Sequence, residues 1–328
     1  MGKDFMAYAE EYNRVLNAGE GLYQQLLSLR EDDTDYLICP EHIGDSIWIC
    51  ALATDYKNTH DCKQVYIVGK DSQLEILERF PDVDGTVSVT AEEMLCLRSY
   101  IYYTECYQAN HIVFAHFHSR ILLNNRGYYA VNLAQEWVFG TMADSRKKIL
   151  DIDMSYSVAP RRMRLFDDGA DAELTQMFSN AIFFLPTMQT QEGYIPDEIF
   201  DALVEAYTKK GYTCYTNYND FPYERMIKNT TPLASSLKEL SVIAPYFKQV
   251  ISVRSGACDL IAQTDANLSV LYHPTDVADA SDVRATPEQI GWMSIFGLVK
   301  RERMAEYVYA AEREEEFIDA LMEQADWD

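Results

Sequence analysis

The sequence predicts an α/β protein of two domains, each built on a parallel sheet with helices on both faces. The chain has 328 residues, whereas a single domain typically has about 100 to 200. Hydrophobic residues make up 48% of it and charged residues 24%, values typical of a packed protein rather than a disordered one. In both halves, short apolar runs alternate with stretches of helical spacing. Strands without a polar face are buried on both sides, which is typical of parallel sheets.

In the amino-terminal half, residues 4–30 carry apolar side chains three or four positions apart, which predicts a helix interrupted near Gly19 and Gly21. Strands and helices then alternate. The predicted strands are 35–39, 64–69, 85–89 and 111–115, and the predicted helices are 47–53, 72–80 and 91–107. We therefore expect a helical segment over 1–30 and an α/β layer domain over 31–150.

A linker is predicted over 151–176, where a basic group, Arg161-Arg-Met-Arg164, precedes an acidic stretch. This group can bind an anionic acceptor or a membrane surface, but the adjoining acids favour a salt-bridged linker. A second α/β domain is predicted over 177–300. Its predicted strands are 181–185, 212–215, 249–253 and 268–272, and its helices are 197–210, one that begins at Ser235, and 256–263. The charged stretch 301–328 has apolar positions that suit one amphipathic helix.

The net charge argues against broad nucleic-acid binding. Lys and Arg total 28 and Asp and Glu 52, which gives a formal net charge of −24. A nucleic-acid surface needs clustered cations that displace counterions from phosphates. The electrostatic field of so negatively charged a protein also repels anionic lipid headgroups. We therefore expect no nucleic-acid partner and at most a peripheral membrane contact.

The cysteines and the amino terminus predict a cytoplasmic protein. Seven cysteines are scattered without a CxxC pair, which is not a disulfide framework. Cys39 and Cys50 lie in apolar runs, where a free thiol behaves as a small hydrophobe, and free thiols are typical of a reducing compartment. The amino terminus is acidic where a signal peptide is apolar, and no apolar run reaches the ~18 to 20 residues that span a bilayer.

Two loops at predicted strand ends are candidate sites, because open parallel sheets bind ligands beyond the carboxyl ends of their strands. In the first loop, Gly44 permits a tight turn and Asp45 opens the next helix. Asp45 is a helix N-cap, a carboxylate that acts as general base, or both. His42, beside Asp45, is a second catalytic candidate that would line the same site, and the alternative is a loop histidine hydrogen-bonded to the backbone.

The second loop follows the strand that ends at Val253. Ser255, Gly256 and Ala257 present backbone N–H groups where a helix begins, which is a common seat for a phosphate. Arg254 supplies a cation with a forked set of donors. The alternative is a tight turn in which this arginine pairs with a neighbouring carboxylate, and the spacing does not decide between the two.

Motifs in a fixed order give the chain a resemblance to a known family. Ile38-Cys-Pro-Glu-His-Ile-Gly-Asp45, Val65-Tyr-Ile-Val-Gly69 and Phe80-Pro-Asp-Val-Asp84 resemble the opening of glycosyltransferase family 9, which includes the ADP-heptose:lipopolysaccharide heptosyltransferases. Further matches are His118-Ser-Arg120, Arg126-Gly-Tyr128, Val253-Arg-Ser-Gly-Ala-Cys-Asp259 and Val270-Leu-Tyr-His-Pro-Thr275. The similarity spans most of residues 35–275.

The resemblance implies a GT-B fold, in which two Rossmann-like domains face each other across a cleft. The domain over 31–150 would then bind the acceptor and that over 177–300 the nucleotide sugar. It implies an inverting, metal-independent glycosyltransferase of cell-surface glycan biosynthesis that moves a sugar from a nucleoside-diphosphate donor to a glycan or glycolipid acceptor, without a cofactor. By the same carry-over, Asp45 is the base, and Ser255, Gly256 and Ala257 hold the donor diphosphate.

Two further positions follow from the resemblance. Thr187 matches a family position near the phosphates, and Glu224 lies about where the family has a ribose-binding glutamate, although an exposed carboxylate at a helix start explains Glu224 equally well. The family's lysine about five residues after Thr187 is missing, since this region holds Gln189, Gln191 and Glu192. We expect Arg254 to replace it as the cation that meets the diphosphate.

No metal site is expected. His116 and His118 alternate across the end of a strand and so do not face one another as metal ligands do. A structural or acceptor-contacting role suits them better.

Two other functions remain open on the sequence. One is a nucleotide-sugar epimerase or hydrolase, because fold does not determine reaction. The other is a non-catalytic GT-B protein that binds a nucleotide sugar without turnover, which the missing lysine makes credible.

Overall fold

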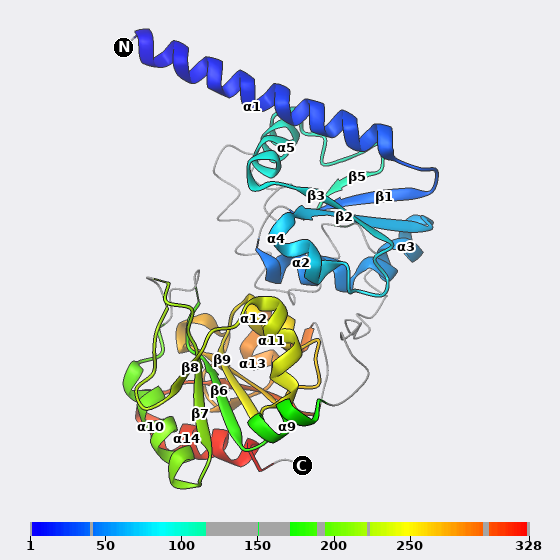
Figure 1. Ribbon diagram of the computed structural model, residues 1–328. Coiled ribbons are helices and arrows are strands. Elements are labelled where there is room, and N and C mark those ends of the chain that lie inside the picture. Colours follow the sequence, from blue (N-terminus) through cyan, green and yellow to red (C-terminus); the bar gives the residue numbers. More distant parts are fainter. Residues whose placement is uncertain are drawn as a thin grey trace. The chain divides into compact units, whose positions relative to one another are not determined.

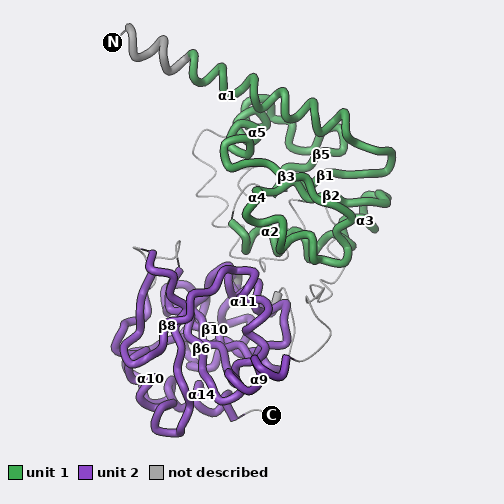
Figure 2. The backbone as a smooth tube through the Cα atoms, viewed as in Figure 1, with its two compact units in different colours: residues 1–139, 143–158 green, residues 140–142, 159–328 purple. Residues whose placement is uncertain are grey.

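The computed structural model describes residues 2–39, 42–115, 150, 171–188, 194–221, 224–297 and 302–326. The chain divides into two compact units (Figure 2): unit 1 comprises residues 1–139 and 143–158, and unit 2 residues 140–142 and 159–328. Each unit has its own sheet with helices packed on it (Figure 1), which confirms the predicted α/β class.

Unit 1 is built on a five-stranded sheet in the order β3-β2-β1-β5-β4. Its strands are β1 (Thr34–Ile38), β2 (Gln64–Lys70), β3 (Gly85–Val89), β4 (Gln108–Ala109) and β5 (Ile112–Phe114), and its helices are α1 (Gly2–Leu29), α2 (Ile43–Ala51), α3 (Ala53–His60), α4 (Asp71–Leu77) and α5 (Ala91–Thr104). The pairings are parallel except that of β4 with β5. All five residues of β1 are buried, as expected for a central strand of a sheet that has helices on its faces.

The helix α1 is continuous, and the predicted interruption near Gly19 and Gly21 is wrong. Gly19 lies where α1 meets α5: a Cβ at this position would be 2.1 Å from the carbonyl oxygen of Cys96. The missing side chain therefore lets the two helix backbones approach closely, as small residues do at helix contacts. The sequence marks this glycine as a breaker, whereas its role is in packing.

Unit 2 is built on a seven-stranded sheet in the order β11-β12-β10-β9-β6-β7-β8. Its strands are β6 (Ala181–Leu185), β7 (Thr213–Asn217), β8 (Thr231–Leu233), β9 (Gln249–Val253), β10 (Leu268–Tyr272), β11 (Arg284–Ala285) and β12 (Met304–Val308). Its helices are α9 (Ala172–Phe178), α10 (Asp197–Lys209), α11 (Leu237–Ile243), α12 (Gly256–Ile261), α13 (Pro287–Ile290) and α14 (Glu314–Gln324), with short 3₁₀ turns η1 (Ala244–Tyr246), η2 (Pro274–Asp276), η3 (Gly291–Met293), η4 (Ile295–Gly297) and η5 (Ala311–Arg313). Only the β11–β12 pairing is antiparallel among these strands.

The stretch 301–328 is not a single helix, which corrects the sequence prediction. It contains β12, a fully buried strand parallel to β10, before α14 begins at Glu314. A glutamate in the middle of this strand, Glu306, gives the segment the look of an amphipathic helix. Glu306 is 1% exposed and accepts hydrogen bonds from the Tyr272 hydroxyl at 2.5 Å and from the Ser294 hydroxyl at 2.7 Å. These donors make its burial tolerable.

A buried polar network fixes α14 to the sheet of unit 2. Gln324 Nε2 donates to Asn267 Oδ1 at 2.8 Å, and Gln324 Oε1 accepts from the Ser269 hydroxyl at 2.6 Å and from the Tyr307 hydroxyl at 2.8 Å. Gln324 has no exposed surface. Every side-chain atom that can hydrogen-bond in this residue therefore has a protein partner, which makes the orientation of the helix specific.

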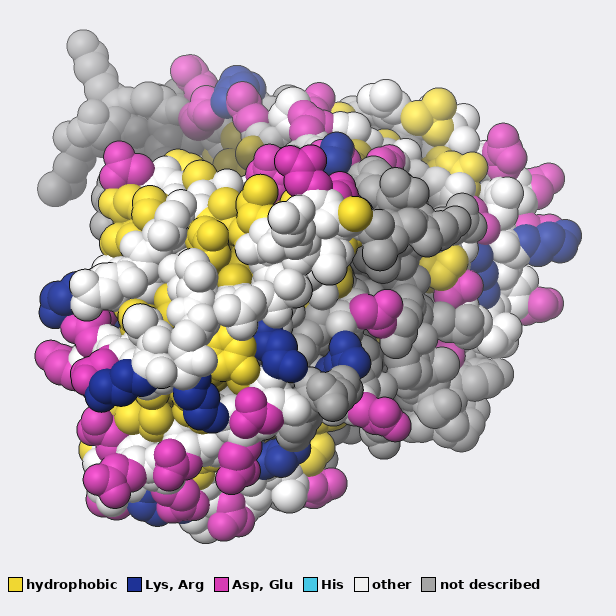
Figure 3. Space-filling view, turned by 60° about the horizontal axis from the view of Figure 1, so that its bottom comes forward, with side chains coloured by type: hydrophobic (Ala, Val, Ile, Leu, Met, Phe, Trp, Pro, Cys, Tyr) yellow, Lys and Arg dark blue, Asp and Glu magenta, His cyan; other side chains and the backbone are white. Residues whose placement is uncertain are grey.

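None of the helices in the described ranges is both long and apolar enough to cross a membrane. On the face shown in Figure 3, the coloured basic side chains lie among acidic ones. This mixture fits a chain with a net charge of −24.

The network predicts that Gln324→Ala destabilises unit 2 by about 3 kcal/mol, because it leaves the buried Asn267 side-chain carbonyl without a partner and removes an acceptor from the buried Ser269 and Tyr307 hydroxyls. Urea denaturation measures this as a lower midpoint. The exposed neighbour Glu323 provides the control, since Glu323→Ala should leave the midpoint within error. Equal midpoints for the two variants would contradict the role of the network.

Candidate functional site

Each sheet has a point at which the chain reverses the direction of strand addition. In unit 2, β7 and β8 lie on one side of β6, whereas β9, β10 and β12 lie on the other. In unit 1 the corresponding pair is β1 and β5. Loops that leave the carboxyl ends of such a pair diverge and leave a crevice, in which open α/β sheets bind their ligands. The residues that follow β1, β6 and β9 are therefore the first candidates.

In unit 1, this point places Asp45 in the first turn of α2. The helix begins at Ile43, and its N-cap is His42, which has an extended backbone and whose carbonyl accepts from the Ser46 N–H at 3.2 Å. Asp45 is therefore not the N-cap, and Gly44 lies within the helix rather than in a turn, which corrects both expectations. His42 is exposed and Asp45 half-buried.

In unit 2, the loop after β9 presents unused hydrogen-bonding groups. Ser255 is the N-cap residue of α12, but its side chain caps no N–H. Its Oγ atom is buried and has no hydrogen-bond partner. Within the described ranges, the N–H groups of Gly256 and Ala257 also have no acceptor. Three polar groups thus lie together at the end of a central strand without protein partners.

Arg254 does not point outward from this loop. The residue is 3% exposed, and its guanidinium forms an ion pair with Asp259 at 2.9 Å, whose side chain is 4% exposed. Its other N–H groups donate to the carbonyls of Met293 at 3.0 Å and Ser255 at 2.8 Å. The expectation that Arg254 meets a diphosphate directly does not fit this geometry, and the alternative, a turn arginine paired with a nearby carboxylate, is what the structure has.

The charge of Arg254 is secure despite its burial. Desolvation is the largest single influence and lowers the pKa of the guanidinium, but the Asp259 carboxylate together with Tyr272 and Cys258 outweighs it, so that the pKa of Arg254 lies above its ordinary value. The arginine stays charged at any pH at which the protein folds, and the pair holds the loop in place.

Further unpartnered polar atoms lie at the same edge of the sheet. In the described part of unit 2, four residues carry buried side-chain oxygen or nitrogen atoms without a hydrogen-bond partner: Asn217, Ser255, Gln263 and Asp276. Asn217 is the last residue of β7, and Asp276 belongs to the turn η2 after β10. Only Gln263, after α12, lies away from the carboxyl ends of the strands. Such atoms are rare in folded proteins and indicate a place for water or a polar ligand.

Sequence reasoning did not single out Asn217 or Asp276. The sequence signal for such a residue is a polar side chain at the end of an otherwise apolar strand. Whether that side chain binds a ligand depends on whether a neighbouring loop supplies a hydrogen-bond partner, which the sequence does not reveal.

Thr187 and Glu224 both lie at this edge, and both side chains accept hydrogen bonds from neighbouring loop residues. Thr187 Oγ1 accepts from the backbone N–H of Arg225 at 3.0 Å, which joins the loop after β6 to the loop after β7. The Glu224 carboxylate accepts from the Asn219 backbone N–H at 2.5 Å and from its side-chain amide at 3.1 Å. Glu224 is half-buried and orders its own loop, rather than starting a helix as an exposed carboxylate.

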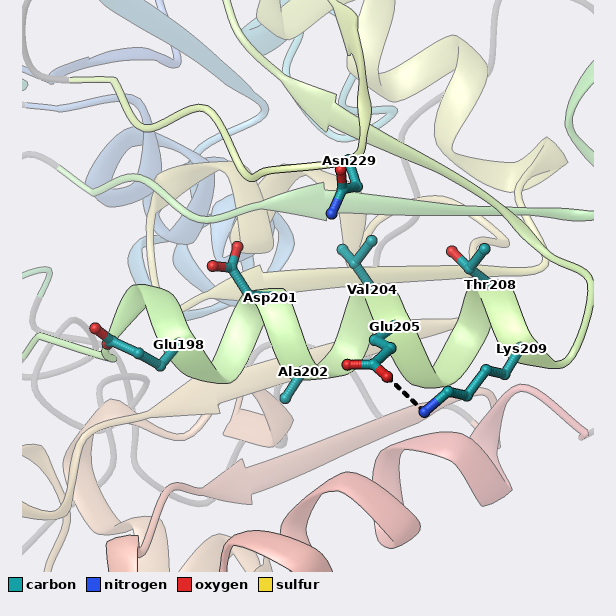
Figure 4. Close-up of a pocket in the computed structure, with 8 residues that line it drawn as sticks. All are labelled: Glu198, Asp201, Ala202, Val204, Glu205, Thr208, Lys209 and Asn229. Carbon is teal, nitrogen blue, oxygen red and sulfur yellow. Dashed lines mark ion pairs between the residues drawn. The ribbon is translucent and has the colours of Figure 1, made fainter.

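A groove on the outer face of α10 is separate from these strand ends (Figure 4). Seven of its lining residues belong to α10, and Asn229 comes from the loop after β7. Glu205 and Lys209 form an ion pair at 2.5 Å along its edge. The groove is open and flanked by carboxylates, and we assign it no role.

Several sequence candidates lie outside the described residues. These are His116, His118, Arg120, Arg126, Tyr128, Arg161, Arg162, Arg164, Gln189, Gln191 and Glu192. Within the described ranges, no three His, Cys, Asp or Glu side chains come together as metal ligands do.

Comparison with solved structures shows the fold. A family 9 glycosyl transferase from Veillonella parvula superposes with a TM-score of 0.57 at 11% identity, over 90% of this chain and 98% of that one. ADP-heptose lipopolysaccharide heptosyltransferase II of E. coli gives 0.56 at 12% identity, over 89% and 98%. The E. coli heptosyltransferase WaaC, solved with ADP, gives 0.53 at 13% identity, over 88% and 98%. The chain has the fold of these glycosyltransferases.

This likeness confirms the GT-B class and the family 9 resemblance at the level of fold. No protein-family model matches the chain, and no curated protein matches it in sequence. Identities of 11 to 13% establish fold and leave the reaction to be argued from the site.

The geometry predicts that Arg254→Ala lowers the free energy of unfolding by about 3 to 5 kcal/mol, because it removes the cation that pairs with the buried Asp259 carboxylate. Adding Asp259→Ala to this variant should restore part of the loss. Urea denaturation of both variants measures the coupling, with Arg303→Ala as an exposed arginine control. A normal midpoint for Arg254→Ala would contradict a structural role for the pair.

Proposed function

We propose that the protein is a glycosyltransferase that moves a sugar from a nucleoside-diphosphate donor to a glycan or glycolipid acceptor. The observation that carries this proposal is the loop after β9, where the buried, unpartnered Ser255 Oγ lies beside the unused N–H groups of Gly256 and Ala257. Donors at the switch point of an α/β sheet suit a phosphate oxygen. The glycosyltransferase fold supports the same assignment.

In this proposal, unit 2 holds the donor. The diphosphate accepts hydrogen bonds from Ser255, Gly256 and Ala257, with Thr187 close by at the end of β6. Asn217, at the end of β7, and Glu224, in the loop that follows it, bind the ribose. Arg254 acts as a positioning residue, because its pair with Asp259 fixes the loop from which these donors point.

In this proposal, fixed hydrogen-bond donors stabilise the leaving group. As the sugar–oxygen bond breaks, negative charge develops on the leaving diphosphate, and N–H groups that already point at it stabilise this charge without reorganisation. The proposed mechanism therefore needs no metal ion and no cofactor.

Unit 1 supplies the base in this proposal. Asp45 takes the proton from the acceptor hydroxyl, which then attacks the sugar carbon from the face opposite the diphosphate and inverts its configuration. His42, exposed at the start of α2, contacts the acceptor. We further propose that the reaction takes place in the cytoplasm and serves the synthesis of cell-surface glycans.

A second candidate is a protein that binds a nucleotide sugar without turnover. One observation favours it: two arginines at this edge, Arg225 and Arg254, are paired with Asp197 and Asp259. Their charges are thus partly neutralised within the protein. The two candidates differ in whether the donor is consumed.

The donor site predicts opposite effects of Ser255→Ala on stability and binding. The variant should keep or raise the melting temperature of the ligand-free protein, because it removes an unpartnered buried hydroxyl. It should weaken binding of a nucleoside diphosphate about tenfold, the value of one hydrogen bond to a charged group. Thermal shifts and calorimetry with ADP, GDP, UDP and dTDP measure both effects.

Ser236→Ala provides the matched control. Ser236 is an N-cap whose hydroxyl accepts from the Glu239 N–H, so its loss should lower the melting temperature and leave nucleotide binding unchanged. If no nucleotide shifts the wild-type transition at millimolar concentration, the donor assignment is wrong.

The proposed base predicts that Asp45→Asn keeps donor affinity but lowers the transfer rate by about 10²- to 10⁴-fold. Release of nucleoside diphosphate from ADP-, GDP- and UDP-sugars, with a glycolipid extract as acceptor, measures the rate. Asp71→Asn, in the first turn of α4, is the control for a helix-start aspartate. Acceptor-independent release would favour a hydrolase, and binding without release the non-catalytic alternative.

A further inference from the structure

The Arg225 guanidinium lies over two aromatic rings near the start of α10. The Arg225 guanidinium lies over the ring of Phe200, 5.2 Å from its centre, and over the ring of Tyr194, 4.2 Å from its centre. Phe200 belongs to the buried core of unit 2 and has no exposed surface. Arg225 therefore contacts one ring of the core and one ring at the surface.

The Arg225 guanidinium is held by hydrogen bonds from several sides. Arg225 Nη2 donates to the Ile195 carbonyl at 2.9 Å and Nη1 to the Pro186 carbonyl at 3.3 Å. Nε donates to Asp197 at 2.8 Å, and Nη2 pairs with the same carboxylate. A guanidinium with so many partners is a rigid support for the ring stacked on it.

The Tyr194 ring is exposed to solvent. Tyr194 is 55% exposed, although its ring is stacked against the guanidinium. One face of the ring is thus covered by Arg225, and much of the rest is available to a ligand. Because the orientation of the ring is already fixed, a second ring that stacks on it loses little conformational freedom of the protein.

The platform of Tyr194, Arg225 and Phe200 adjoins the proposed donor site on its nucleoside side. Tyr194 lies between β6 and α10, and Arg225 directly follows Glu224 in the loop after β7. The backbone N–H of Arg225 donates to Thr187, so this loop and the end of β6 are in contact. A nucleoside whose diphosphate is at the β9 loop and whose ribose is at the β7 loop extends away from β9, toward this platform.

We propose that the open face of Tyr194 binds the base of the donor nucleotide by stacking. The inference rests on the proposed function, since it needs a nucleotide in unit 2. Bases stack readily on aromatic rings, and this contact tolerates different bases. The cation behind the ring draws electron density from it, which favours contact with an electron-rich base. Tyr194 thus contributes affinity, while polar groups elsewhere select the base.

The test compares two substitutions at one position with ligands that have or lack a base. Tyr194→Ala should weaken binding of ADP, GDP or UDP, whichever binds the wild type, about tenfold, a typical value for loss of one stacked base. Tyr194→Phe should bind as the wild type does. Inorganic pyrophosphate, which lacks a base, should bind wild type and Tyr194→Ala equally, in contrast to Ser255→Ala, which should weaken both ligands.

Tyr103→Ala, an exposed tyrosine of unit 1 that is 64% accessible, is the control for loss of a surface ring. If Tyr194→Ala binds the nucleotide as tightly as the wild type does, the stacking role is wrong and the proposed function remains intact. Equal weakening of pyrophosphate and nucleotide also overturns it, because Tyr194 would then act through the shape of the loop. If no nucleotide binds the wild type, both the inference and the donor site are wrong.

Discussion

The buried ion pair between Arg254 and Asp259 is the constraint on which the candidate donor site depends. Two charges with almost no exposed surface are tolerated only if both are paired and hydrogen-bonded with good geometry. Arg254 also donates to the carbonyls of Ser255 and Met293, and the bond to Met293 ties the loop after β9 to the segment after α13. The Tyr272 hydroxyl and Glu306 brace that segment from β10 and β12. The N–H groups of Gly256 and Ala257 are therefore presented by a loop that cannot move without exposing a buried charge.

This constraint also settles which groups face a ligand. Arginine charges at the edge are matched internally, Arg254 by Asp259 and Arg225 by Asp197, in a chain whose net charge is −24. The groups left without partners are backbone N–H groups and neutral or acceptor side-chain atoms. A site of this kind recognises an anion by the direction of its dipoles, which adds geometric selectivity that a mobile lysine does not supply.

The sequence predicts the architecture well because parallel strands leave a direct signal: buried on both faces, they are apolar throughout. The sequence does not predict β12, because Glu306 interrupts its apolar run. Gly19 resembles a helix breaker in the sequence, because its packing partner Cys96 lies 77 positions away in the chain. The loops of the site were predicted from the ends of strands. The role of Arg254 was not, because it depends on whether Asp259 folds back onto it. The stack of Tyr194 on Arg225 joins two loops, and no local pattern encodes that contact.

The unpartnered atoms provide an argument for a ligand that does not depend on resemblance. A buried polar atom without a partner costs roughly 1 to 3 kcal/mol, so an alanine at Ser255 would make the ligand-free protein no less stable. Of the four residues in the described part of unit 2 that carry such atoms, Asn217, Ser255 and Asp276 lie at the carboxyl ends of three different strands of one sheet. A fold optimised for stability alone has no reason to collect these costs at one edge. A polar molecule that binds there and satisfies several of them together gives that reason, and the switch point between β6 and β9 is where the topology alone would place it.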